Sequence, residues 1–241
     1  MNNLYLYLNI FTLLFPLLLS FDRKVAFYKE WKYLFPAILI MGVFFIGKDV
    51  IFAANNIWAF NDDYLLGVRI LGLPVEEWMF FFTVPYACVF IYACLLAYLK
   101  VDPLKKIHRP FLFVLAVVLL VVAIMNYQKL YTSIVFAITA LLLLYNLLKK
   151  QPWLSMFLLS YFVALIPFLL VNGLLTGSFI ESQVVSYNPE HNLNIRILTI
   201  PIEDSIYNLL MLLMTVQLME WFKSWHNQPD PVMMGENRIM D

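Results

Sequence analysis

Residues 73–82 read LPVEEWMFFF and place two adjacent acids, Glu76 and Glu77, at the head of a long apolar run. The whole chain of 241 residues contains 63% hydrophobic and only 13% charged residues. Soluble domains average about 25% charged residues. The sequence therefore predicts an integral membrane protein. Its net charge of zero, without any basic block, argues against a nucleic-acid partner.

Apolar runs long enough to cross a bilayer recur seven times along the chain. A membrane-spanning helix needs about 20 predominantly apolar residues. The seven runs cover, approximately, residues 3–20, 33–54, 78–99, 110–125, 129–148, 153–175 and 203–222. They predict an all-α integral membrane fold with seven transmembrane helices.

The basic residues are distributed unevenly between the two sides of this predicted bundle. Twelve of the 16 lysines and arginines fall on one side, among them Arg238 near the C-terminus. The other four are Lys48, Arg69, Lys129 and Arg196. Because lysine and arginine concentrate in cytoplasmic loops, we predict a multi-pass protein of the cell (inner) membrane with its N-terminus outside. No obligate protein partner is predicted.

The opening stretch has a second copy in the other half of the chain, where IPIEDS follows the same pattern as LPVEEW. Between positions 61 and 77 the two copies are identical at seven of 17 positions. The identical pairs include Asn61 with Asn188, Arg69 with Arg196, Pro74 with Pro201 and Glu76 with Glu203. Glu77 is matched by Asp204. Since the same shift carries the first three apolar runs onto the last three, the copies are expected to be parallel in the membrane.

This repeat predicts a single membrane domain with internal symmetry, in which three helices, a connecting helix and three more helices follow one another. The predicted parts are a first repeat at 1–100, a linker helix at 101–128, a second repeat at 129–225 and a cytoplasmic tail at 226–241. The arrangement resembles that of microbial rhodopsins.

The four acids Glu76, Glu77, Glu203 and Asp204 have two interpretations. Proline and acids in a first helical turn stabilise the start of a helix, so each pair could be a helix cap. Ionisable groups beside a spanning segment are costly, however, and tend to face the interior of a bundle and mark sites. A poorly solvated acid suits general acid catalysis, and a neighbouring arginine would favour an ionised partner. Four carboxyls and two arginines in one pocket would supply both.

Aromatic and polar residues near these acids extend the predicted site. Aromatic faces can stabilise a carbocation formed when an acid protonates an alkene. The candidates are Trp58, Phe60, Trp78, Phe80, Tyr187 and Tyr207. An aromatic belt at the membrane interface explains the same residues equally well. Asp49 and Asn172, in the second and sixth runs, are candidate supporting residues or, with equal weight, helix–helix hydrogen-bonding residues.

These motifs resemble the lycopene cyclase domain family, the small integral-membrane carotenoid cyclases. The resemblance is carried by NIWAFN (56–61), LGLPVEEWMFFF (71–82), LVNGLLTG (170–177), VVSYN (184–188) and RILTIPIEDSIYNLL (196–210). The resemblance covers both halves of the chain. The chain is therefore similar to the fused form of this family, which also occurs as paired subunits.

The resemblance implies acid-catalysed cyclisation of the linear ends of lycopene, drawn from the bilayer, to β-ionone rings. By similarity Glu76, Glu77, Glu203 and Asp204 become candidate acids and bases, and Asn61, Asn188, Arg69 and Arg196 become supporting groups. A longer carotenoid or another ring isomer stays open, and so does the role of Asp204, where the first copy has glutamate. No cofactor is predicted, although a loosely bound reduced cofactor also stays open.

Other functions fit the sequence less well. A retinal photoreceptor needs a lysine inside its seventh helix, and residues 203–222 contain none. A small-solute or lipid transporter would suit parallel repeats, but its acids are expected at the midplane rather than at one end. His108, His191 and His226 lie in separate segments without the spacing of a metal site, and no dinucleotide-binding glycine motif is present.

Overall fold

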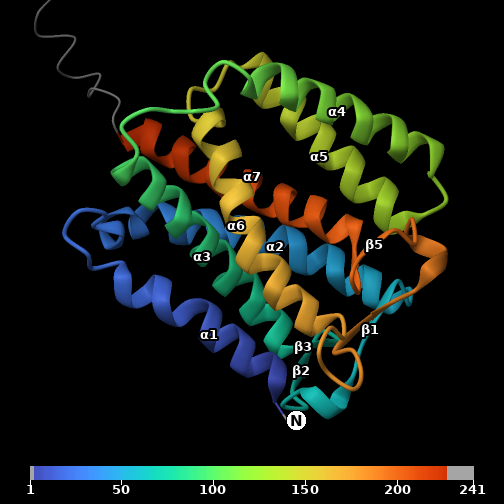
Figure 1. Ribbon diagram of the computed structural model, residues 1–241. Coiled ribbons are helices and arrows are strands. Elements are labelled where there is room, and N and C mark those ends of the chain that lie inside the picture. Colours follow the sequence, from blue (N-terminus) through green and yellow to red (C-terminus); the bar gives the residue numbers. More distant parts are fainter. Residues whose placement is uncertain (1–2, 227–241) are drawn as a thin grey trace, which may run out of the picture.

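The computed structural model describes residues 3–226, which form seven α-helices, three 3-10 helices and six short strands. The α-helices run along one another as a bundle, and the strands gather at one end of it, here called the strand end (Figure 1). The α-helices are α1 (Leu4–Leu19), α2 (Trp31–Ala54), α3 (Val75–Tyr98), α4 (His108–Met125), α5 (Leu130–Leu148), α6 (Leu154–Leu175) and α7 (Ile202–His226). The predicted tail beyond His226, with Arg238, lies outside the described residues.

Six of these helices are long and apolar enough to cross a membrane, which confirms the prediction of a helical membrane protein. They are α2 to α7, and α2 continues a short 3-10 helix, η1 (Phe27–Glu30). The helix α1 is apolar but has only 16 residues. The count of six therefore falls one short of the seven predicted spans.

The acids lie in the first turns of the helices α3 and α7. Pro74 has an extended backbone, with ψ of 147°, and α3 starts at the next residue. Pro201 likewise directly precedes α7. Because α3 starts three residues before the predicted apolar run, Glu76 and Glu77 lie inside its first turn.

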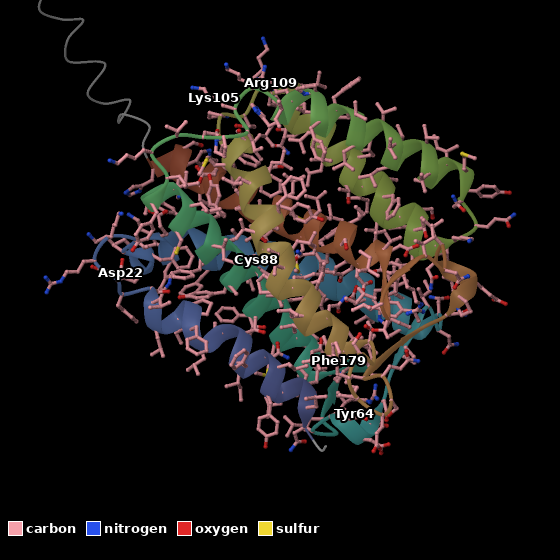
Figure 2. All side chains as sticks on the ribbon, viewed as in Figure 1. Asp22, Tyr64, Cys88, Lys105, Arg109 and Phe179 are labelled. Atoms are coloured by element: carbon pink, nitrogen blue, oxygen red, sulfur yellow. The ribbon has the colours of Figure 1, made fainter. Side chains whose placement is uncertain are left out.

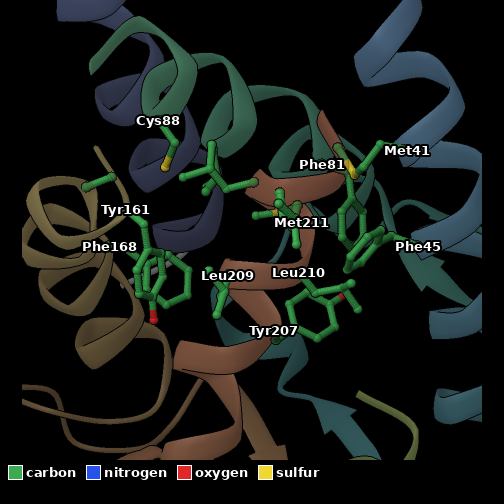
Figure 3. Packing of buried hydrophobic residues seen from close by; sticks show 14 of the residues in the cluster. Met41, Phe45, Phe81, Cys88, Tyr161, Phe168, Tyr207, Leu209, Leu210 and Met211 are labelled. Carbon is green, nitrogen blue, oxygen red and sulfur yellow. The ribbon is translucent and has the colours of Figure 1, made fainter. Parts of the chain in front are cut away.

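The helix α7 forms the centre of the bundle and packs against α2, α3, α5 and α6. Its middle segment, from Leu209 to Leu213, is almost completely buried. Phe45 and Phe81 pack on one side of α7, whereas Tyr161 and Phe168 pack on the other (Figure 3). The acidic start of α7 is therefore held in the interior, between neighbouring helices.

The remaining short elements belong to the loops at the strand end. They are β1 (Trp58–Phe60), η2 (Asp62–Tyr64), β2 (Arg69–Ile70), β3 (Leu73–Pro74), β4 (Val185–Tyr187), η3 (Pro189–His191), β5 (Arg196–Ile197) and β6 (Ile200–Pro201). Tyr64 and Phe179 lie at this end, and Lys105 and Arg109 lie at the opposite end (Figure 2).

The strands β1 and β4 join the two sequence repeats about a local twofold axis. They pair antiparallel, with Ala59 opposite Ser186, its own counterpart in the second copy. Two matched backbone bonds of 2.9 Å flank this pair, one from Asn61 N–H to the carbonyl of Val184 and one from Asn188 N–H to the carbonyl of Ile57. Such reciprocal pairing is what a twofold axis between two copies requires.

The hairpins that lead into α3 and α7 also repeat residue by residue. The strands β2 and β3 pair Arg69 with Pro74, and β5 and β6 pair Arg196 with Pro201. Leu71 and Leu198 both adopt the left-handed region, with φ of 53° and 56°. The same turn therefore positions the first helical turn of α3 and of α7.

Candidate active site

A pocket lies at the strand end, where the starts of α3 and α7 meet the ends of α2 and α6. Its lining residues come from both repeats: Tyr5, Asp49, Trp58, Phe60, Glu77, Phe80, Tyr131, Phe168, Asn172, Leu175, Val185, Tyr187, Asp204 and Tyr207. The cavity measures about 40 Å³, little more than the volume of one water molecule. A larger guest would have to displace side chains of this lining.

The pocket brings together nine of the predicted site residues. They are Asp49, Trp58, Phe60, Glu77, Phe80, Asn172, Tyr187, Asp204 and Tyr207. Seven others lie outside the lining: Asn61, Arg69, Glu76, Trp78, Asn188, Arg196 and Glu203. In each motif one acid lines the pocket and the adjacent acid does not, because neighbouring residues on a helix point about 100° apart.

Asp204 is surrounded by hydrogen-bond donors. Its two carboxylate oxygens accept bonds from the hydroxyl of Tyr131 at 2.5 Å, the amide of Asn172 at 2.6 Å and the hydroxyl of Tyr187 at 2.9 Å. Burial and the neighbouring Asp204 carboxylate raise the pKa of Tyr187 well above its ordinary value, so this phenol stays neutral and keeps its proton to donate. Three donors on one carboxylate are the surroundings that stabilise an anion.

Glu77 occupies the matching position in the first repeat but has different surroundings. It accepts one side-chain hydrogen bond, from the hydroxyl of Tyr5 at 2.6 Å. Its other polar neighbours in the lining include a second carboxylate, Asp49. The two acids therefore face the same cavity with one donor on one side and three on the other.

Asp49 is paired with a lysine that the sequence analysis had not assigned to the site. The ammonium of Lys48 lies 2.9 Å from the Asp49 carboxylate, which also accepts the Tyr207 hydroxyl at 3.0 Å. The same ammonium lies 4.0 Å from the ring centroid of Tyr207 and 5.1 Å from that of Trp58. The aromatic rings beside the pocket are thus arranged around a positive charge.

Glu76 and Glu203 hold the loops instead of lining the cavity. Each is fully buried and accepts a backbone N–H at 2.6 Å, from Leu66 and from Leu193 respectively, both in the segment that leads into the hairpin. Glu203 also accepts the hydroxyl of Thr132 at 2.6 Å. The bond from the backbone N–H to the buried glutamate is the same in both repeats. It fixes each hairpin against the helix that follows it.

The predicted arginines are not pocket residues, which corrects the expectation of two arginines beside the acids. Arg69 and Arg196 are exposed and donate to the carbonyls of Gly72 and Thr199 within their own hairpins. Arg69 also forms an ion pair with Asp62 at 2.6 Å. Their retention in both copies is explained by the shape of the hairpin.

The asparagines and Trp78 have similar local roles. Asn61 and Asn188 cap the 3-10 helices η2 and η3 by accepting the N–H groups of Asp63 and Glu190. The indole of Trp78 donates to the carbonyl of Ile70 at 3.3 Å, and Trp78 lines a separate cavity between α2 and α3.

Tyr5 and Tyr131 are site residues that the sequence analysis missed. They bond to Glu77 and Asp204 in the same way, from equivalent places on α1 and α5. The exact counterpart of Tyr5 at the shift that relates Asn61 to Asn188 is Thr132, directly after Tyr131, so an alignment without a gap does not match the two tyrosines. Allowing a one-residue offset at the start of each repeat would have found the pair.

The fold and this pocket define a helical membrane protein with an acidic, aromatic-lined site between two repeats. The chain belongs to the lycopene cyclase family: the family model described as Lycopene cyclase matches residues 2–95 and 128–222. The first matched region contains α1, α2 and most of α3, and the second contains α5, α6 and most of α7. No curated protein and no solved structure matches the chain in the corresponding searches.

Proposed function

We propose that the protein is a lycopene β-cyclase, which converts the linear ends of lycopene into β-ionone rings without net redox change. The observation that carries this proposal is the unequal hydrogen bonding of two carboxylates, Glu77 and Asp204, in one aromatic pocket. Such an isomerisation needs one group that gives a proton and another that takes one. Membership of the lycopene cyclase family supports the substrate class.

Glu77 is the proposed general acid. With one side-chain donor against the three around Asp204, a negative charge on Glu77 has less hydrogen-bond stabilisation than one on Asp204, and the neighbouring Asp49 carboxylate is already paired with Lys48. Its proton passes to the terminal double bond of the linear end. The electron pair of that double bond forms the new C–H bond and leaves a tertiary carbocation. The next suitably placed double bond then attacks this cation, which closes the ring and moves the positive charge into it.

Asp204 is the proposed base. Its three donors stabilise the anion before the reaction and hold the carboxylate in one orientation. Asp204 removes a proton from the ring carbon next to the cation, and the electrons of that C–H bond become the ring double bond. The β-ring follows if this carbon is the one shared with the polyene chain. The cycle closes when Asp204 loses the proton and Glu77 regains one.

The aromatic rings are proposed to stabilise the cation between these two steps. Phe60, Phe80 and Tyr207 line the cavity from both repeats. The contact of Lys48 with the Tyr207 ring supports the idea that these π faces attract a positive charge. Since the reaction neither consumes nor releases electrons, no redox cofactor is included in the proposal.

In the membrane we propose seven spans in the order of three helices, a linker helix and three helices, with the N-terminus outside and the C-terminus in the cytoplasm. At about 1.5 Å per residue, α1 would reach about 24 Å, short of a hydrocarbon core of about 30 Å. A short span is accommodated by local thinning of the bilayer. The strand end would then lie at the outer face, and lycopene would reach the pocket from the bilayer.

Expression in a lycopene-accumulating host, with pigments separated by chromatography, tests the proposal. Wild-type protein is expected to produce γ-carotene, with one ring, and β-carotene, with two. Lycopene left unconverted in membranes that contain the folded protein would contradict the activity. A parallel host that makes a longer linear carotenoid tests the substrate, and rings with the double bond at another position would contradict the assignment of the β isomer.

A further inference from the structure

A second cavity adjoins the active-site pocket, between α1, α3 and α6. It measures about 280 Å³; we refer to it as the α1–α3–α6 groove. Phe168 lines both the groove and the pocket. The two spaces therefore share a wall.

Each of the three helices contributes residues to both the pocket and the groove. On α3 these residues begin with Glu77 and Phe80 and continue with Val84 and Ala87. These positions are three or four residues apart, so they lie on one face of the helix. Pocket residues thus pass into groove residues without a change of helical face.

The helices α1 and α6 repeat this pattern. On α1, Tyr5 near the start of the helix lines the pocket, and Leu19 at its end lines the far part of the groove. At the rise of an α-helix, these two positions are separated by about 21 Å along the helix axis. On α6, Leu175 lines the pocket and Ala164 the groove. The pocket and the groove together therefore extend along the axis of the bundle.

The groove is almost entirely apolar. Its lining contains one hydroxyl, that of Thr12, and one thiol, that of Cys88, and otherwise hydrocarbon side chains. Two of the residues that leave it open are alanines, Ala87 and the fully buried Ala164. Such a surface is suited to a linear hydrocarbon and unsuited to a charged solute.

The second repeat does not leave the same room. At the shift that relates the two copies, the counterparts of Val84 and Ala87 in α7 are Met211 and Met214. Met211 is completely buried. Larger side chains therefore occupy the positions that are open on α3, and the local twofold symmetry of the strands does not extend to the groove.

We propose that the α1–α3–α6 groove binds the linear polyene chain of the substrate while its end reacts between Glu77 and Asp204. This inference rests on the proposed cyclase function and names how that substrate is held. Phe168 divides groove from pocket and turns aside when the reactive end passes into the pocket, which is too small for it in the closed arrangement. The substrate then lies along the helices, with the rest of its length in contact with lipid.

A third cavity, which is also apolar, provides the matched control. It measures about 700 Å³, lies between α2 and α3, and is lined by Val43 and Trp78 among others. It shares no lining residue with the active-site pocket. Ala87→Phe fills the proposed groove, and Val43→Phe places the same ring in the control cavity.

Two readouts separate this inference from the proposed activity. The first is the rate of lycopene conversion per folded protein in membranes. The second is the amount of lycopene that stays bound during purification of the Glu77→Gln protein, with and without each phenylalanine. Ala87→Phe is expected to lower both by about tenfold or more, because overpacking displaces the chain. Val43→Phe is expected to leave both within about twofold of its parent.

Each result has a definite meaning. Full conversion and full binding by Ala87→Phe would overturn the groove assignment, and so would losses confined to Val43→Phe. If Ala87→Phe does not fold, as judged by size-exclusion chromatography, Ala87→Leu replaces it with a smaller graded loss expected. A wild-type protein that binds lycopene without converting it would contradict the cyclase function, while the effect of Ala87→Phe on binding would still decide the groove.

Discussion

The surroundings of Glu77 and of Asp204 differ although the segments that carry them are built alike. Both residues follow a hairpin of the same shape, a proline and a buried glutamate that clamps a loop amide. Around Asp204 three donors converge, whereas Glu77 has one. The repeated scaffold therefore sets the position of the acids, and the residues that differ between the repeats set their chemistry.

The difference shows why a symmetric frame suits an acid–base reaction. Two identical carboxylates on a twofold axis would compete for one role. The first repeat has Phe45 and Phe60 where the second has Asn172 and Tyr187, so two of the three donors to Asp204 have no counterpart beside Glu77. Separate surroundings for two carboxylates are the general route to separate acid and base roles.

The strongest test of the comparison removes the proposed proton donor. Glu77→Gln keeps the shape of the side chain and the acceptor for Tyr5, but it cannot supply the proton. We expect cyclisation to fall by about 100-fold or more, the usual contribution of a general acid. The measurement is the initial rate of ring formation in membranes with equal amounts of folded protein.

Glu76→Gln is the matched control for this change, because the same substitution falls on the neighbouring residue. Its remaining oxygen can still accept the Leu66 N–H, so activity is expected to stay within a few-fold of wild type. Equal losses in both variants would show that the pocket does not distinguish the two acids and would contradict the assignment of Glu77.

The second prediction concerns the base. Asp204→Asn removes the anion and keeps one of the two oxygens that accept hydrogen bonds, and we expect a loss of cyclisation of about 10- to 100-fold. A variant with both Glu77→Gln and Asp204→Asn is expected to lose little more than Glu77→Gln alone, because the two residues act in one reaction sequence. If the double variant instead loses activity by the product of the two single losses, the two residues have independent roles.

The third prediction compares the two tyrosines that hold these acids. Tyr131→Phe removes a donor to the proposed anion, and a hydrogen bond to a charged group is worth about 1.5–3 kcal/mol. Activity is expected to fall by about tenfold. Tyr5→Phe removes the donor to the proposed neutral acid and is expected to cost only a few-fold. The reverse order would exchange the roles of Glu77 and Asp204.

The fold could be predicted from the sequence where apolar length decides the outcome. The seven apolar runs each overlap a helix, but α3 begins at Val75 rather than at 78 because acids in a first helical turn do not look apolar. The strands could not be predicted. Pairs such as Ala59 with Ser186 depend on contact between the two repeats, and strands of two or three residues have no periodic pattern of their own.

The site could be predicted only to the level of the motif. The repeat indicated both acidic pairs, but which acid of each pair faces the cavity depends on how the helix is rotated, and packing sets that rotation. The arginines repeat in the sequence for the sake of the hairpin, so their retention in both copies misled the assignment. Lys48 carries no motif at all and enters the site only through three-dimensional proximity, whereas Tyr5 matches Tyr131 only when the repeats are offset by one residue.

The smallest predicted effect also comes from a difference between the repeats. Arg69 and Arg196 make the same hairpin bond, but among residues 3–226 only Arg69 has an acidic partner, Asp62, because the second repeat has Pro189 at that position. Both groups of the ion pair are solvent-accessible, and exposed ion pairs contribute about 0–1 kcal/mol.

Arg69→Ala should therefore lower the thermal stability of the purified protein slightly more than Arg196→Ala. This excess should vanish at high salt, because mobile ions screen exposed charges. Asp62→Asn should reproduce that excess in the protein with both arginines intact. Neither arginine variant should change the rate of ring formation by more than about twofold; a large loss of activity with unchanged stability would return the arginines to the active site.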